Sequence, residues 1–258
     1  MLQRLTGMLQ MRRSEERRTV AQIPDGERVY AIGDIHGRKD LLQQLLTMLK
    51  ADAADFKGKI TLVGIGDYID RGPDSKGVVD TLLAEIPTGW EKIFLRGNHE
   101  QAMLDFMDAP LLRGEWLAWG GIQAMESYGV APYGARGMRD SAALAAEFSQ
   151  TLEENGHDAF YKATRLSFTC GDYLFVHAGV RPGVPADKQM ADDLLFIRDD
   201  FIGREHHLPY RVVFGHTILE EPLMADDRIG LDTGAFQSNV LTAVRLEGET
   251  ATILQAKP

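Results

Sequence analysis

Apolar runs and helical leucine repeats alternate along the first hundred residues. Residues 28–32, 59–65 and 91–95 form short apolar segments that predict buried strands. Between the first two, leucines recur three or four positions apart, which predicts a helix with one apolar face. The leucines are Leu41, Leu42, Leu45, Leu46 and Leu49. A second helix is expected from Lys76 to Ala84, ended by Pro87. Alternating strands and helices predict an α/β fold.

The pattern changes after residue 100. Residues 101–169 are rich in Ala, Met, Leu and Glu and predict a mostly helical insertion beside the site. Strands are then expected at residues 173–176, 211–214, 228–231, 240–246 and 250–254. The last two flank Gly248 and predict an antiparallel hairpin. We therefore expect two mixed β-sheets packed as a sandwich with flanking helices, in a single domain over residues 26–258.

Residues 1–25 are expected to form an N-terminal arm. Five arginines stand there among Leu and Met residues: Arg4, Arg12, Arg13, Arg17 and Arg18. The preferred interpretation is a loosely ordered arm or a short helix on the body. A membrane-surface or targeting role is the alternative, which the acidic Glu15 and Glu16 disfavour.

Composition narrows the classes of partner. The formal net charge is -10, which disfavours a nucleic-acid backbone but permits a phosphorylated substrate at a bound cation. No apolar run is long enough for a membrane span, and no signal peptide is recognisable. Cys170 is the only cysteine, so the sequence predicts a reducing, cytoplasmic location.

Five expected strands are each followed by side chains that can bind metals. In open α/β sheets the sites form at the strand ends, so these side chains are expected to converge. Four of the seven histidines lie in these segments, and their mixed oxygen and nitrogen donors suit Mn, Fe or Zn. The candidates are Asp34 and His36 in GDIHG, Asp67 and Asp70 in GDYIDRG, Asn98 and His99 in RGNHE, His177 in VHAG, and His216 in FGHT.

In this order, the five segments resemble the motifs of metal-dependent serine/threonine phosphoprotein phosphatases, particularly the bacterial and phage lambda-type branch. The resemblance covers about residues 28–246 and includes LFIRDDF and GLDTGA. It implies a calcineurin-like metallophosphoesterase fold and two divalent ions, with Mn²⁺ first and Fe or Zn as alternatives. One ion would be held by Asp34, His36 and Asp67, and the other by Asp67, Asn98, His177 and His216.

The same resemblance implies in-line hydrolysis by a hydroxide that bridges the two metals. His99 would be the general acid, and Asp70 would orient it. Arg71, Arg96 and Arg198 would bind the phosphate oxygens. Glu100, which closes RGNHE, is expected to support the loop or cap the following helix instead of binding a metal.

One position departs from the family pattern. Trp119 in WLAWGG stands where bacterial relatives commonly carry Asn. An aromatic ring there would reshape the pocket if the Asn contacts substrate. The preferred interpretation is that Trp116 and Trp119, three apart on a helical face, both belong to the core.

Three functions remain open. A phosphatase acting on phosphoserine, phosphothreonine and small aryl phosphates is the leading hypothesis, supported by LFIRDDF and the insertion. Symmetrical dinucleoside polyphosphate hydrolases, such as those that cleave diadenosine tetraphosphate, resemble the same motifs and are the alternative. A non-catalytic scaffold would lack a ligand or the acid, and every one is present. The sequence specifies neither the physiological substrate nor the oligomeric state.

Overall fold

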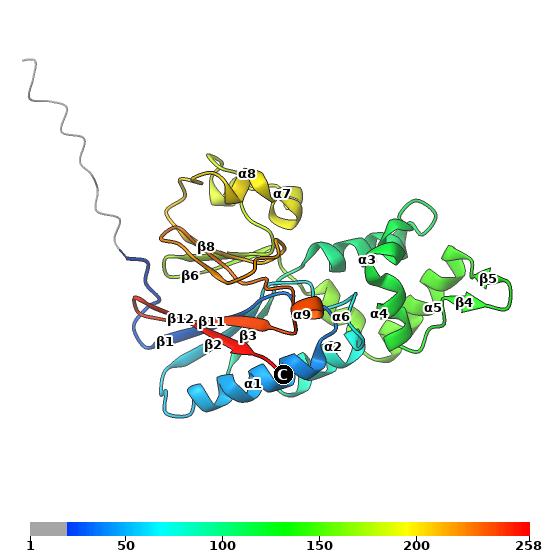
Figure 1. The fold of residues 1–258 in the computed structure, drawn as a ribbon, viewed down its shortest axis with the longest axis horizontal. Helices are drawn as coiled ribbons and strands as arrows, with labels where there is room; N and C mark the ends of the chain where they lie inside the picture. The colour runs from blue at the N-terminus through cyan, green and yellow to red at the C-terminus, as the bar shows by residue number, and fades with distance from the viewer. Residues whose placement is uncertain (1–19) are drawn as a thin grey trace, which may run out of the picture.

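The computed structural model describes residues 20–258, and two five-stranded sheets form its centre (Figure 1). In the first sheet, β1, β2 and β3 are parallel, and β11 runs antiparallel to both β1 and β12. Its order is β12 (Thr250–Ala256), β11 (Leu241–Glu247), β1 (Glu27–Ile32), β2 (Lys59–Gly64) and β3 (Glu91–Phe94).

In the second sheet, β7, β8 and β10 are parallel, and β6 and β9 are antiparallel edge strands. Its order is β6 (Ser167–Cys170), β7 (Tyr173–Val176), β8 (Arg211–Phe214), β10 (Arg228–Gly230) and β9 (Leu223–Met224). The sandwich of two mixed sheets with flanking helices that the sequence predicts is therefore confirmed.

Side chains that alternate along the strands build the core on both faces of the first sheet. Val29 and Ala31 lie between the sheets, against Phe175 and Val213 of the second sheet's cluster. Tyr30 belongs to the apolar cluster on the opposite face, where the helices pack. This two-residue period buries residues 28–32 of β1 on both faces of the sheet.

Helices cover the outer faces of both sheets (Figure 1). The helix α1 (Lys39–Asp52) buries the five predicted leucines, and α2 (Ser75–Ala84) packs beside it. Helices α7 (Ala191–Phe196) and α8 (Asp199–Ile202) contribute side chains to the cluster outside the second sheet. A short helix, α9 (Ala235–Ser238), precedes β11.

The region between β3 and β7 is helical for most of its length but differs from the prediction in three ways. Helix α3 (Asn98–Asp108) begins inside the RGNHE motif, a two-stranded hairpin interrupts the helices, and residues 167–170 form β6. The short edge strand β6 has exposed Ser167 and Thr169, so no apolar run signals it. The remaining elements are a π-type helix (Leu117–Gly121), α4 (Ile122–Ser127), β4 (Tyr133–Gly134), β5 (Gly137–Met138), α5 (Ser141–Glu154) and α6 (His157–Lys162).

The N-terminal end of the described chain lies against the turn of the β11–β12 hairpin. The hairpin turns at Gly248, where φ is 51°, as the sequence predicts. The backbone N–H of Ile23 donates to the Gly248 carbonyl at 2.9 Å, and the Ile23 side chain is buried between the sheets. The described part of the predicted arm, residues 20–25, therefore lies against the body. The five arginines lie outside the described residues. Within residues 20–258, no helix combines the length and apolarity needed to cross a bilayer.

Candidate metal centre

The predicted ligands follow five parallel strands, three in one sheet and two in the other. Asp34, Asp67 and Asn98 follow β1, β2 and β3, and His177 and His216 follow β7 and β8. Because both sheets present these carboxyl ends to one region, the loops meet there. Left-handed backbone is concentrated in these loops. Of seven described non-glycine residues with positive φ, five are predicted site residues: His36, Asp67, Asp70, Arg71 and His216.

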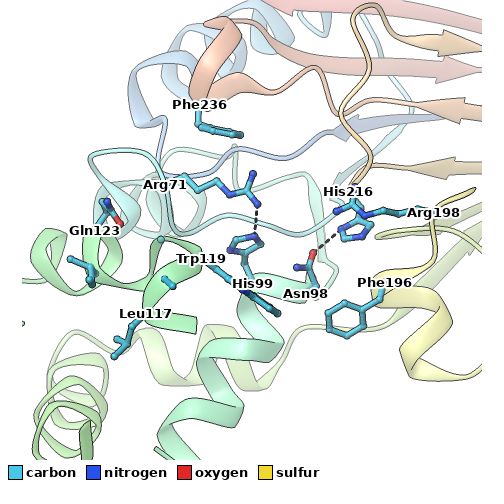
Figure 2. A pocket seen from close by; sticks show the side chains of 13 residues that line it. Arg71, Asn98, His99, Leu117, Trp119, Gln123, Phe196, Arg198, His216 and Phe236 are labelled. Atoms are coloured by element: carbon cyan, nitrogen blue, oxygen red, sulfur yellow. Dashed lines mark hydrogen bonds between the residues drawn. The ribbon is translucent and has the colours of Figure 1, made fainter. Parts of the chain in front are cut away.

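Direct contacts link ligands that are far apart in the sequence. Asn98 Oδ1 lies 2.9 Å from His177 Nε2 and 2.8 Å from His216 Nδ1. The backbone N–H of His216 donates to Asp34 Oδ2 at 3.0 Å. Figure 2 shows Asn98 and His216 facing each other at the cavity. These four side chains therefore form one buried group and are not scattered over separate surfaces.

Asp67 lies between two groups of imidazoles. Its carboxylate is 3.5 Å from His36 Nε2, 3.9 Å from His99 Nε2 and 3.5 Å from His177 Nε2. Among residues 20–258, two sets of side chains have donor atoms close enough to hold an ion, and Asp67 belongs to both. These sets are His36–Asp67–His99 and Asp67–His177–His216. A carboxylate shared by two donor groups is the arrangement that holds two neighbouring cations.

Backbone carbonyls orient two of the imidazoles. His36 Nδ1 lies 2.8 Å from the Ile69 carbonyl, and His177 Nδ1 lies 2.9 Å from the Ile65 carbonyl. When each Nδ1–H donates to its carbonyl, the Nε2 lone pair faces the centre. Fixing the tautomer in this way is typical of histidines that bind metals.

The buried polar atoms and charges fit a pair of divalent cations. Among the described residues, Asp34 Oδ1 and His216 Nε2 are buried without a hydrogen-bond partner. Burial, reinforced by the nearby Asp232 and Asp67, raises the pKa of Asp34 well above its ordinary value. Burial also lowers the pKa of His36 and of His216 to about 3, which leaves both rings neutral and able to bind a metal. Bound cations would supply both the missing partners and the missing positive charge.

His99 belongs to a second, smaller network. Its Nδ1 lies 2.6 Å from Asp70 Oδ2, and the indole N–H of Trp116 donates to the same oxygen at 2.8 Å. Burial opposes protonation of His99, but the charges of Asp67 and Asp70 outweigh burial and raise its pKa. The ring is therefore held with Nε2 toward Arg71, whose guanidinium lies 3.1 Å away.

Glu100 organises the loop that carries Asp67. Its Oε2 accepts the backbone N–H of Asp67 at 2.8 Å and that of Gly97 at 2.9 Å, and its Oε1 accepts the N–H of Tyr68 at 2.8 Å. The prediction that Glu100 supports the loop and caps the helix is confirmed. Gly97 is required because a Cβ there would lie 2.0 Å from Asp67 Oδ1.

A cavity of about 720 Å³ opens over Asn98, His99 and His216. Figure 2 shows Arg71 and Arg198 entering it from opposite sides. Arg96 does not line it: its guanidinium donates to Thr164 Oγ1 and Gln101 Oε1, both at 3.0 Å. The structure thus brings two of the three predicted arginines to the cavity.

Three aromatic rings outside the predicted site residues also line this cavity: Trp119, Phe196 and Phe236. The prediction that both tryptophans belong to the core is correct for Trp116, which is 0% exposed, and wrong for Trp119, which is 41% exposed. Residues 117–121 form a π-type element that is broken at Gly120, directly after Trp119, where φ is 121°, so a regular helical period does not apply here. The glycine pair after Trp119 was the available signal.

Residues 27–235 match the model of the calcineurin-like phosphoesterases. The chain belongs to this family. It is therefore a metallophosphoesterase, and its two candidate ion-binding groups are consistent with a dimetal site.

The relatives carry two kinds of name. The chain is 24% identical over 256 residues to the bis(5'-nucleosyl)-tetraphosphatase [asymmetrical] of Oceanobacillus iheyensis, covering 88% of this chain and 92% of that one. It is 38% identical over 95 residues to serine/threonine-protein phosphatase 1 of Salmonella typhimurium, but this match covers only 37% of this chain and 40% of that one. A solved structure described as a candidate diadenosine tetraphosphatase superposes with a TM-score of 0.59 at 21% identity, covering 92% of this chain and 98% of that one. This last likeness concerns the fold.

Proposed function

We propose that this metallophosphoesterase hydrolyses dinucleoside polyphosphates of the diadenosine tetraphosphate type. The observation that carries the proposal is a likeness along nearly the whole chain to an enzyme named for that substrate. The cavity adds support, because it combines arginines, which suit phosphates, with aromatic rings, which suit nucleobases. This reverses the order of the two hypotheses drawn from the motifs.

The ligand assignment from the motifs remains our proposal for the metals. Asp34, His36 and Asp67 would hold one ion, and Asp67, Asn98, His177 and His216 the other. Two bound divalent cations would make a water nucleophilic and withdraw charge from the phosphate oxygens. The donor set suits Mn, Fe or Zn, and the resemblance to the phosphatase family favours Mn²⁺ among them.

The remaining residues act on the substrate. Arg71 and Arg198 bind phosphate oxygens from two sides of the cavity, and their charge stabilises the transition state. His99 Nε2 carries a proton to the leaving oxygen, and Asp70 holds the ring at its Nδ1. Arg71 and His99, 3.1 Å apart, both point donors at the cavity once His99 is protonated, so one bound phosphate can accept from both.

A phosphoprotein phosphatase is the second candidate function. It is favoured by the 38% identity over 95 residues to serine/threonine-protein phosphatase 1, the highest local identity among the relatives described above. The two reactions share the metals, the nucleophile and the phosphate-binding arginines. They differ in the group that occupies the rest of the cavity.

Turnover on two substrates separates the candidates. The chelator-treated protein is assayed with diadenosine tetraphosphate and with a phosphoserine peptide, each with added Mn²⁺, Fe²⁺ or Zn²⁺. We expect metal-dependent cleavage of diadenosine tetraphosphate at a larger kcat/KM. A larger value on the peptide would favour the second candidate, and no turnover with any metal would favour a scaffold. Product analysis then distinguishes asymmetrical cleavage, which gives ATP and AMP, from symmetrical cleavage, which gives two ADP.

A further inference from the structure

Trp119 is a large aromatic side chain held at the open surface of a polar site. Trp116 is fully buried, whereas Trp119 is 41% exposed and lines the metal cavity. The indole therefore offers a partly exposed aromatic face on the wall of the cavity, which a planar ligand can cover.

The backbone next to Trp119 is locked to the loop that carries the site. Gly120 has φ at 121°, and a Cβ at this position would lie 2.5 Å from the backbone nitrogen of Arg71 and 2.9 Å from Asp70 Cβ. Only glycine allows this close approach. The backbone that carries the indole is therefore packed against Asp70 and Arg71 and is not part of an independent loop.

The Trp119 ring lies beside His99, the residue that would protonate the leaving oxygen. The ring centroids of Trp119 and His99 are 6.2 Å apart and tilted by 58°. Figure 2 shows Trp119 on the side of His99 opposite to Arg71, while Phe236 lies beyond Arg71. Phe236 is already engaged, since the guanidinium of Arg71 lies 4.8 Å above its ring and His36 packs edge-on against it. Trp119 is therefore the aromatic side chain that lines the cavity next to His99, where the leaving group would lie.

We propose that Trp119 stacks on the nucleobase of the nucleotide that lies on the His99 side of the cleaved bond. The inference rests on the proposed function, and it names the residue that selects a nucleotide over an inorganic phosphate. Stacking suits this position because every base offers a π-face, and the indole presents a rigid surface with few torsions to restrain. Stacking forms no covalent bond, so Trp119 contributes to the affinity and the positioning of the substrate.

The test uses two inhibitors that differ by the nucleoside. Inhibition constants of AMP and of inorganic phosphate are measured against p-nitrophenyl phosphate hydrolysis by the Mn²⁺-loaded protein. In Trp119→Ala we expect the constant for AMP to rise about 10- to 100-fold, because base–aromatic stacking contributes about 1–3 kcal/mol. The constant for phosphate should change less than about twofold. Trp119→Phe should recover most of the AMP affinity, because it restores an aromatic face.

Trp90→Phe is the matched control, because Trp90 is partly buried and stacks on Tyr30, outside the residues that line the cavity. It should leave both constants unchanged. A second readout needs no turnover: AMP added to the metal-free protein should quench tryptophan emission in the wild type and in Trp90→Phe, but not in Trp119→Phe.

Three results would overturn the proposal. These are an unchanged AMP constant in Trp119→Ala, an equal rise for AMP and phosphate, and quenching that persists in Trp119→Phe. If the inhibition constant of AMP rose only in Phe236→Leu, the nucleobase would stack on Phe236 and not on Trp119. Failure of the proposed function is seen separately, because it appears as absent cleavage of diadenosine tetraphosphate by the wild type.

Discussion

His99 and Asp70 form a buried pair in which Nδ1 lies 2.6 Å from Oδ2. The pair is fixed from two sides. The indole N–H of Trp116 donates to the same Asp70 oxygen, and the backbone N–H of Asp70 donates to Ser75 Oγ at the start of α2. Trp116 and Ser75 are themselves fully buried. The pair therefore positions one nitrogen, His99 Nε2, toward the cavity, and the raised pKa of His99 favours a proton on it.

Replacing this acid should matter in proportion to the leaving group's need for a proton. His99→Asn should lower kcat on a phosphoserine peptide by about 10²–10⁴-fold, because a serine alkoxide leaves poorly without protonation. The loss on p-nitrophenyl phosphate and on diadenosine tetraphosphate should be much smaller, since nitrophenolate and phosphate groups leave readily. Steady-state kinetics on the three substrates measures this. Equal losses on all three would remove His99 from the acid role.

The sequence predicts that the candidate ligands converge, because parallel strands bring their carboxyl ends together. Asp34, Asp67 and Asn98 are read directly from three strand ends, and the structure joins them to His177 and His216 from the second sheet. Hydrophobic runs are sufficient for this inference. Hydrophobic runs do not indicate where a long side chain points. The prediction that Arg96 lines the cavity rested on its position in the motif alone, whereas in the structure its guanidinium donates to Thr164 of the insertion.

The surroundings of the centre depend on backbone geometry that a periodic pattern does not encode. Trp119 leaves the core because the chain breaks at Gly120, and β6 was missed because its outward side chains are polar. Phe196 and Phe236 reach the cavity from helices that are only six and four residues long. Elements this short have no helical period to detect.

The different positions of Arg71 and Arg96 give a matched pair of substitutions. Arg71→Ala should raise the inhibition constant of inorganic phosphate at least about tenfold, because hydrogen bonds to charged groups contribute about 1.5–3 kcal/mol. Arg96→Ala should leave it within about twofold, since this guanidinium contacts Thr164 and Gln101. Competitive inhibition by phosphate is the measurement. A comparable rise in both variants would show that Arg96 turns toward the phosphate when it binds.

Glu100 should be essential to stability although it binds no metal in our assignment. Its two oxygens accept the backbone N–H groups of Asp67, Gly97 and Tyr68. In Glu100→Gln the amide NH₂ would face at least one of these donors, which should lower the free energy of unfolding by about 1–3 kcal/mol. Urea denaturation of the metal-free protein measures the effect without a contribution from bound ions. Glu126→Gln, at an exposed position, is the control and should change little.

His157, which does not line the cavity, should make the free energy of unfolding depend on pH. Its Nδ1 lies 2.7 Å from the Tyr128 hydroxyl and its Nε2 lies 3.1 Å from Asp80 Oδ1. Burial lowers its pKa, partly offset by Asp80, so the folded state binds a proton less readily than the unfolded chain. The contribution of neutral His157 to the free energy of unfolding is therefore fully present above the unfolded pKa of about 6.5, and it is lost as the pH falls below this value.

Substitution by an uncharged residue should flatten this dependence. Between about pH 7.5 and pH 5, the free energy of unfolding should fall less in His157→Gln than in the wild type, because the variant cannot take up that proton on unfolding. Urea denaturation at both pH values isolates the effect, since the other titrating groups are common to both proteins. Parallel losses would show that His157 titrates alike in both states. A steeper loss in the variant would mean that Asp80 stabilises a charged His157 in the folded protein and that burial does not dominate.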